Sequence, residues 1–176
     1  MSEEIVNRVA KSALITLDLS DYAPNQEILE IDIKQFLFNQ LILKETNFRD
    51  KIKGFDFNLY KNSITTIVCS ANSIIPMWGF MLVASNLKKV NAKIYSGNKQ
   101  SVFQKIFLEN IDRINPSDFE NKKIIVKGCS TIPISQELYI AITNKLQKNI
   151  SSLMFGEACS AVPIYKKKNE SKNQRN

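Results

Sequence analysis

From Ile64 onward the sequence alternates short β-branched runs with longer segments of helical periodicity, and this alternation limits the possible folds more than any other feature. It is typical of βαβ units that build a parallel sheet. The expected strands are residues 64–69, 92–95, 123–126 and 152–155, and the expected helices are residues 76–89, 100–111 and 135–148. The sequence therefore predicts an α/β fold with a doubly wound, mainly parallel four-stranded sheet and helices on both faces.

The first 60 residues have a different pattern. Apolar and polar residues alternate around Leu17 and again around Ile31, which predicts two half-buried strands joined by a turn near Pro24. We expect these strands to form an antiparallel β-hairpin. Residues 36–43 are apolar nearly throughout, and Thr46 is expected to cap a short helix after them. This part would be a β-rich extension of the parallel core.

We expect residues 1–165 to form one domain, because no polar linker separates a hairpin and helical layer (1–60) from a βαβαβαβ core (61–165). Residues 166–176 carry five basic residues and one acidic residue, so they hold +4 of the net charge of +7. This segment is expected to be a disordered basic tail. Only four of the 24 basic residues are Arg, the residue preferred for bidentate phosphate and base recognition, so the sequence predicts no nucleic-acid partner.

The chain contains no histidine, which excludes Ser-His-Asp and Cys-His nucleophilic sites, His-ligated zinc and imidazole acid–base catalysis.

Glu3 and Glu4 stand where a signal peptide would carry positive charge, and no long apolar run follows them. The longest apolar stretch, residues 74–84, is much shorter than the roughly 20 residues needed to span a bilayer. We therefore expect a cytoplasmic protein with reduced thiols and no membrane contact.

The three cysteines occupy equivalent places in the predicted pattern. Cys69, Cys129 and Cys159 each lie at or just past the carboxyl end of a predicted strand, and each is followed by Ser and then by a proline a few residues later. Parallel strands end at the same edge of a sheet, so the cysteines are expected to share that edge. With the strand order 2-1-3-4, the crevice at which the order reverses would lie between Cys69 and Cys129, where open α/β sheets bind ligands.

Three thiolates without a histidine suit ligation of a metal, so the leading hypothesis is a metal or iron–sulfur binding protein. Cys69, Cys129 and Cys159 would bind zinc or an iron–sulfur cluster, with Glu157 as the nearest carboxylate to complete the set. Whether the chain catalyses any reaction is left open by the sequence.

Three alternatives remain. A thiolate of Cys69 or Cys129, stabilised at a helix N-terminus, could serve a sulfur-transfer or redox enzyme. Hydroxyl and amide groups beside the cysteines could instead hold a small anion; these residues are Ser70, Ser73, Ser130, Thr131 and Ser160. No nucleotide-binding glycine motif follows any predicted strand. In the third alternative the cysteines are structural, and residues 36–43 form the interface of a homodimeric scaffold.

Several blocks of the sequence resemble a bacterial family described as a domain of unknown function, number 2480. The resemblance spans nearly the whole chain except the basic tail. It is carried by residues 4–10, 41–45 and 48–49, by Cys69-Ser70, and by residues 127–130 and 156–163. Genes of that family tend to lie beside those of the sulfur-mobilising iron–sulfur assembly system. The resemblance therefore implies an auxiliary role in cluster or sulfur handling, with iron–sulfur assembly proteins as partners.

Overall fold

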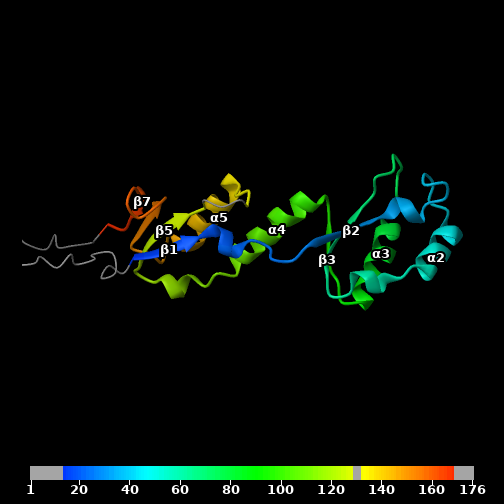
Figure 1. The fold of residues 1–176 in the computed structure, drawn as a ribbon, viewed down its shortest axis with the longest axis horizontal. Helices are drawn as coiled ribbons and strands as arrows, with labels where there is room; N and C mark the ends of the chain where they lie inside the picture. The colour runs from blue at the N-terminus through cyan, green and yellow to red at the C-terminus, as the bar shows by residue number, and fades with distance from the viewer. Residues whose placement is uncertain (1–13, 129–131, 169–176) are drawn as a thin grey trace, which may run out of the picture. The chain divides into compact units, whose positions relative to one another are not determined.

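The computed structural model describes residues 14–128 and 132–168. They form a mixed α/β structure with mainly parallel strands, which confirms the predicted class. The chain divides into two compact units, and Figure 1 labels helices and strands of both. Unit 1 comprises Met1–Ala23 and Phe107–Asn176, and unit 2 comprises Pro24–Ile106. No helix in the described part of the chain is long and apolar enough to cross a bilayer.

Unit 2 contains a three-stranded parallel sheet in the order β2-β3-β4. The strands are β2 (Ile28–Asp32), β3 (Ile64–Val68) and β4 (Lys93–Ser96). The connection from β2 to β3 contains the 3-10 helix η2 (Ile33–Phe36), the helix α2 (Glu45–Gly54) and the 3-10 helix η3 (Phe57–Tyr60), and α3 (Met77–Lys89) connects β3 to β4. The helices predicted after Thr46 and at residues 76–89 are therefore present.

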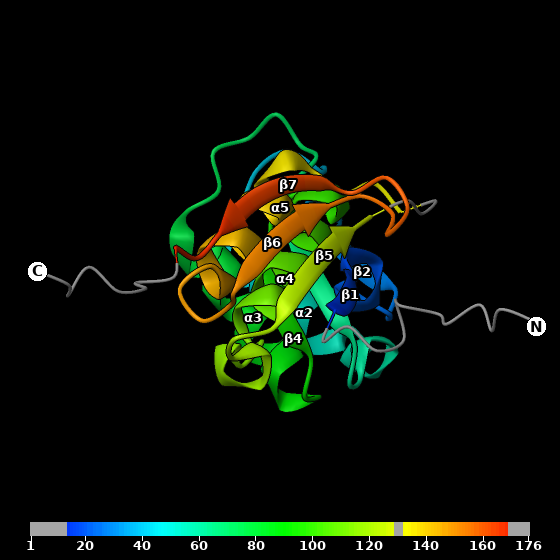
Figure 2. The same cartoon turned by 90° about the vertical axis from the view of Figure 1, so that its left-hand side faces the viewer.

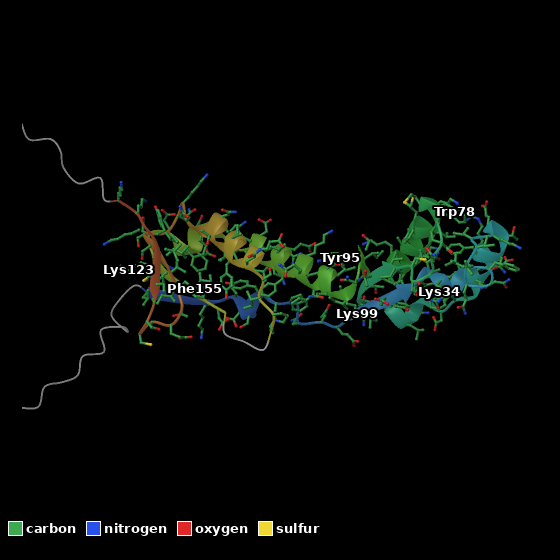
Figure 3. The ribbon with its side chains drawn as sticks, turned by 90° about the horizontal axis from the view of Figure 1, so that it is seen from above. Lys34, Trp78, Tyr95, Lys99, Lys123 and Phe155 are labelled. Carbon is green, nitrogen blue, oxygen red and sulfur yellow. The ribbon has the colours of Figure 1, made fainter. Side chains whose placement is uncertain are left out.

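Helices cover both faces of this sheet. Successive residues of a strand point to opposite sides, so Ile67 and Ile64 of β3 contact helices on different faces. Ile67 of β3 belongs to a core cluster with Phe48 of α2 and Val83 of α3. Ile64 belongs to a second cluster that includes Val102; this residue lies on α4 (Lys99–Asp112). Trp78, labelled in Figure 3, packs edge to face on Phe48 with 5.6 Å between the ring centroids.

Unit 1 contains a four-stranded sheet in the order β1-β5-β6-β7. The strands are β1 (Leu14–Asp18), β5 (Lys123–Lys127), β6 (Ser152–Phe155) and β7 (Val162–Lys166). The first three are parallel and β7 is antiparallel to β6. Around them lie the 3-10 helices η1 (Leu19–Tyr22) and η4 (Pro116–Phe119) and the helix α5 (Gln136–Leu146). Figure 2 shows α5 behind the sheet, while no described helix covers the face toward the viewer.

The predicted apolar stripe of α5 faces the core of unit 1. Leu138, Ile142 and Leu146 recur every four residues, and all three are buried. Ser135 precedes the first helical residue as expected, although its side chain makes no capping hydrogen bond. These three side chains of α5 therefore form part of the buried core of unit 1.

The predicted hairpin of the first 60 residues is wrong. β1 pairs in parallel with β5, and β2 pairs in parallel with β3, so the two strands belong to different sheets. Each strand pairs with a strand of its own unit, and the chain passes from unit 1 to unit 2 near Pro24 instead of making a hairpin turn there. It returns to unit 1 within α4.

The single doubly wound sheet is also not found. β3 and β4 lie in one sheet and β5 and β6 in the other, and the described strands of each sheet follow chain order without a reversal. The crevice predicted between Cys69 and Cys129 required their strands to be neighbours in one sheet, and β3 and β5 are not. The prediction failed because β1 and β2 were not recognised as parallel partners that complete two separate sheets.

The predicted disordered tail begins too early. Lys166 is the last residue of β7, and the backbone N–H of Lys167 donates to the Ser151 carbonyl at 2.9 Å. Residues 169–176 lie outside the described residues. β7 was not predicted because Pro163 stands within it; proline is usually confined to edge strands, and β7 is one.

Candidate functional site

The carboxyl edge of the unit 2 sheet brings together side chains from the ends of β2 and β3. Asp32 ends β2 and accepts two hydrogen bonds at Oδ1, from the backbone N–H of Lys34 at 2.9 Å and from that of Ser70 at 3.1 Å. The Ser70 hydroxyl donates to Asp32 Oδ2 at 2.5 Å. The carboxylate therefore connects the end of its own strand to a loop 38 residues away along the chain.

The charge of Asp32 is stabilised by these contacts. Partial burial of the carboxyl opposes ionisation, but the hydrogen bonds from Ser70 and from the Lys34 backbone outweigh it, together with the Lys34 charge. The pKa of Asp32 is consequently held below its usual value. At neutral pH the carboxylate is ionised and holds the Ser70 loop in place.

A second contact holds the same loop. The Ser73 hydroxyl donates to the Leu41 carbonyl, and the Ser73 N–H donates to the Ala71 carbonyl at 2.9 Å. Ser70 and Ser73 were predicted as donors to a small anion. In the structure both hydroxyls donate to acceptors of the protein itself.

The loop and the start of α3 expose a group of large apolar side chains, which we call the α3 surface. Its members are all more than half exposed; they are Leu41, Ile42, Ile74, Met77 and Met81. Ile74 is 97% exposed. The bond from Ser73 to Leu41 places the turn at residues 38–42 beside the loop. A fixed, fully exposed isoleucine beside two exposed methionines is typical of a surface that binds a partner.

The two described cysteines lie in different units. Cys69 directly follows β3, is half-buried, and has its Sγ 3.9 Å from the Ala71 carbonyl. Cys159 is exposed in the turn between β6 and β7, where its Sγ lies 4.0 Å from Ser160 Oγ. Glu157 is in the same turn, and its carbonyl accepts from the Ser160 N–H at 2.9 Å. Three other predicted site residues lie outside the described residues, namely Cys129, Ser130 and Thr131.

The described residues do not by themselves fit a cysteine-ligated metal. Among residues 14–128 and 132–168, no three Cys, Asp or Glu side chains gather in a way that could hold an ion. Cys159 and Glu157 share one turn, which offers two ligands where zinc usually takes three or four from protein. A ligand set from these residues alone would be incomplete.

The family described as Protein of unknown function (DUF2480) matches residues 3–167. The chain belongs to this family. No curated protein and no solved structure matches the chain.

In this DUF2480 chain an aspartate ends the first strand of each unit, and neither of the two was predicted as a functional residue. Asp18 ends β1 and accepts from the Ser20 N–H at 3.0 Å and the Ser20 hydroxyl at 2.6 Å, and it pairs with Lys127 Nζ at 3.4 Å. The Ser20 hydroxyl is the main reason that the pKa of Asp18 lies below its usual value. The signal was present as a repeated pattern, because each of the first two apolar alternations ends in Asp.

Proposed function

We propose that the chain is a non-catalytic binding protein that forms a homodimer through the α3 surface. The observation that carries this proposal is Ile74, which is 97% exposed on a loop fixed by Asp32 and by Leu41. Large apolar side chains gathered on a rigid surface are typical of a protein interface. A mobile loop could fold such a side chain inward, whereas this loop is held by hydrogen bonds at both serines.

A second copy of the chain suits this surface. Met77 and Met81 are four residues apart on α3, so they form a stripe on one face of the helix, and Ile74 lies in the loop that leads into the helix. Another helix can pack against this stripe. A twofold axis allows one stripe to pack on its own copy, which is the commonest arrangement in oligomers. None of the five residues is charged, and Lys88 on α3 stands seven residues beyond Met81, about 10 Å along the helix axis. If the two copies of α3 cross near the stripe at about 50°, Lys88 of one copy stays away from Lys88 of the other.

The non-catalytic part of the proposal is supported by the hydrogen bonds of the loop. Ser70 and Ser73 donate to Asp32 and Leu41, so both hydroxyl protons are already engaged within the protein. The Asp32 carboxylate accepts three hydrogen bonds within the protein and its pKa is lowered, which makes it a weak base. These groups fix the loop, and the loop presents the α3 surface.

The test is the oligomeric state of the full chain, measured by sedimentation velocity across protein concentrations. We expect the wild type to dimerise at micromolar concentration, and Ile74→Asp and Met77→Asp to weaken dimerisation at least about 10-fold, because each buries a charge in the interface. Leu59→Asp is the matched control. Leu59 is also apolar and 69% exposed, and it lies on η3, which precedes β3, whereas the α3 surface follows β3.

Two results would contradict the proposal. One is a wild-type chain that stays monomeric at about 100 µM, well above the dissociation constant expected of a specific homodimer. The other is an equal effect of Leu59→Asp and Ile74→Asp. Circular dichroism of each variant verifies that the fold is retained.

Cysteine ligation is a second candidate, and the accessibility of the thiols favours it. Cys159 is exposed and Cys69 half-buried, so neither is a fully buried packing residue. The protein would bind zinc or an iron–sulfur cluster and assist in sulfur or cluster handling, with Cys129 as a further ligand. Metal content and absorbance between about 320 and 450 nm, measured on protein purified without oxygen, test this candidate. We expect Cys129→Ala to abolish binding, and metal-free protein with intact thiols would refute it.

A thiol-dependent enzyme makes a different prediction from ligation. It needs one cysteine that is ionised near neutral pH, and such a thiol reacts with iodoacetamide below pH 8 faster than a model thiol. Cys159 is the more exposed of the two described cysteines, so Cys159→Ala distinguishes its reaction from that of Cys69. Alkylation of all three cysteines at no more than the rate of a model thiol would remove this alternative.

A further inference from the structure

Lys123 and three consecutive lysines more than 40 residues later in the chain line the same groove in unit 1. They line a groove of about 940 Å³, and we call it the lysine groove; its lysines are Lys123, Lys166, Lys167 and Lys168. All four are exposed, and no Asp or Glu is among the described residues that line it. The groove therefore concentrates positive charge at one place.

The sheet register creates this arrangement. Lys123 of β5 pairs with Ser152 of β6, and Ser152 pairs with Lys166 of β7, so these three residues form one row across the sheet. Two strand spacings put the Cα atoms of Lys123 and Lys166 about 10 Å apart. Figure 2 shows these strands side by side with α5 on the opposite face, and Figure 3 labels Lys123. The Lys167 N–H donates to the Ser151 carbonyl, which extends the pairing beyond β7.

Apolar and aromatic residues also line the lysine groove. They are Met154, Pro163 and Tyr165. Lysines beside apolar and aromatic side chains are the combination used to bind unpaired nucleotides, in which bases stack on a ring and phosphates lie along the charges. The bases of a duplex are already paired and stacked, so they could not stack on these side chains.

The residue type favours phosphate over an acidic protein surface. Lysine is depleted in protein–protein interfaces, whereas nucleic-acid interfaces are strongly positive. Lysine offers a point charge without the planar fork of arginine, which suits sequence-independent contacts to phosphate. We propose that the lysine groove binds single-stranded nucleic acid, with its four lysines on phosphates and Tyr165 against a base.

This proposal replaces the expectation of no nucleic-acid partner, which rested on charge counted along the chain. Counting along the chain assigned Lys166–Lys168 to a tail and left Lys123 in the body. Pairing of β5, β6 and β7 joins them. The proposal is independent of the α3 surface, which belongs to unit 2.

The salt dependence of binding gives a quantitative expectation. Each phosphate contact to a single strand contributes about −0.7 to the slope of log K against log salt, so four lysines predict a slope of about −3. Sequence-independent binding of this kind has a Kd of the order of micromolar or weaker at physiological salt. A 20-nucleotide oligothymidylate with a fluorescent label, followed by anisotropy from 50 to 300 mM salt, is the probe.

The test compares two fourfold variants of the full chain. The first variant replaces all four lysines of the groove by Gln, namely Lys123, Lys166, Lys167 and Lys168. It should weaken binding at least about 10-fold at 50 mM salt and bring the slope of log K against log salt close to zero. The matched control replaces four other exposed lysines by Gln and removes the same charge; they are Lys53, Lys61, Lys88 and Lys148. The control should bind within about 3-fold of the wild type with an unchanged slope.

Tyr165 supplies an independent readout. Tyr165→Ala should weaken binding by about 5-fold or more without changing the salt slope, and Tyr165→Phe should bind like the wild type because it keeps the ring. Equal loss in both lysine variants would overturn the proposal, as would undetectable binding by the wild type at 50 mM salt. A labelled polyglutamate peptide that binds as tightly as the oligonucleotide would also overturn it, in favour of an acidic protein partner.

Discussion

The two units of the molecule begin with the same local arrangement and differ in what they build on it. In each, a short strand ends in an aspartate that caps a 3-10 helix, Asp18 in unit 1 and Asp32 in unit 2. The parallel partner of that strand starts two residues after an asparagine with positive φ, 56° at Asn121 and 57° at Asn62. The units thus share a repeated strand and turn geometry.

Main-chain hydrogen bonds repeat as well. The N–H of Asn62 donates to the Val90 carbonyl at 3.1 Å, and the N–H of Asn121 donates to the Asn149 carbonyl at 2.8 Å. In both units the donor precedes one strand and the acceptor precedes the next. These bonds fix the amino edge of each sheet.

The carboxyl edges differ. In unit 2 the aspartate holds Ser70 of a distant loop, and this loop presents the α3 surface. In unit 1 the aspartate holds Ser20 nearby and pairs with Lys127 on the neighbouring strand. The same strand-ending aspartate therefore supports an apolar surface in unit 2, while unit 1 carries a basic groove at the opposite end of its strands.

The largest expected effect separates the cores of the two units. Phe48 of unit 2 and Leu138 of unit 1 are both fully buried. Phe48→Ala should lower the free energy of unfolding by about 3–5 kcal/mol and Leu138→Ala by about 2–5 kcal/mol, because each leaves a cavity. Amide hydrogen exchange should show lost protection mainly in the unit that carries the substitution. Equal loss of protection in both units would show that they unfold as one.

A smaller effect is expected from the two aspartates. Asp32→Ala should lower the free energy of unfolding by about 1 kcal/mol, since it removes partners of exposed groups that water can partly replace. Asp18→Ala should cost less, because Ser20 is held only two residues away while Ser70 is held across 38. Urea denaturation of both variants measures the difference. A larger cost for Asp18→Ala would reverse this order.

The same aspartates predict a pH dependence. Their pKa values are lower in the folded protein than in the unfolded chain, so their stabilising contribution is complete above the unfolded value near 3.8. It is lost as the pH falls through the folded values. The free energy of unfolding should therefore decrease on acidification below about pH 4, and Asp32→Asn should flatten this decrease. Denaturation curves from pH 3 to 7 provide the measurement, and an unchanged slope in the variant would contradict the assignment.

The smallest expected effect concerns the asparagines with positive φ. Glycine adopts this conformation without strain, so Asn121→Gly should change the free energy of unfolding by only a few tenths of a kcal/mol. Asn62→Gly should cost about 0.5 kcal/mol more, because Asn62 Oδ1 accepts a hydrogen bond from Asn91 Nδ2 at 3.0 Å. Equal thermal stabilities of the two variants would show that this bond contributes nothing.

Sequence patterns predicted the local elements better than the way they pair. The runs at Ile64–Val68 and Lys123–Lys127 and the helix at Met77–Lys89 were recognised because their apolar spacing is a local property. Whether β1 pairs with β2 or with β5 depends on contacts between residues more than 100 positions apart, and apolar alternation is the same in either case. Apolar alternation alone therefore could not assign each strand to one of the two sheets.

For the candidate sites too, the position of a residue along the chain was predicted better than its contacts with other strands. The places of Cys69 and Cys159 after their strands follow from local pattern, and both were predicted correctly. The role of Ser70 depends on Asp32, which belongs to another strand, and the sequence suggested an external anion instead. The lysine groove was missed because it exists only once β5, β6 and β7 lie side by side.

Pro163 on β7 has a consequence for how the protein behaves at high concentration. β7 is an edge strand of the unit 1 sheet, and Val162 and Ile164 on it are more than half exposed. An edge of this kind could recruit strands of other molecules and start aggregation. Proline lacks the N–H that such a strand would need, and the lysines that follow repel an identical edge. The protein can thus keep apolar residues at a sheet margin without offering that margin as a template for fibre growth.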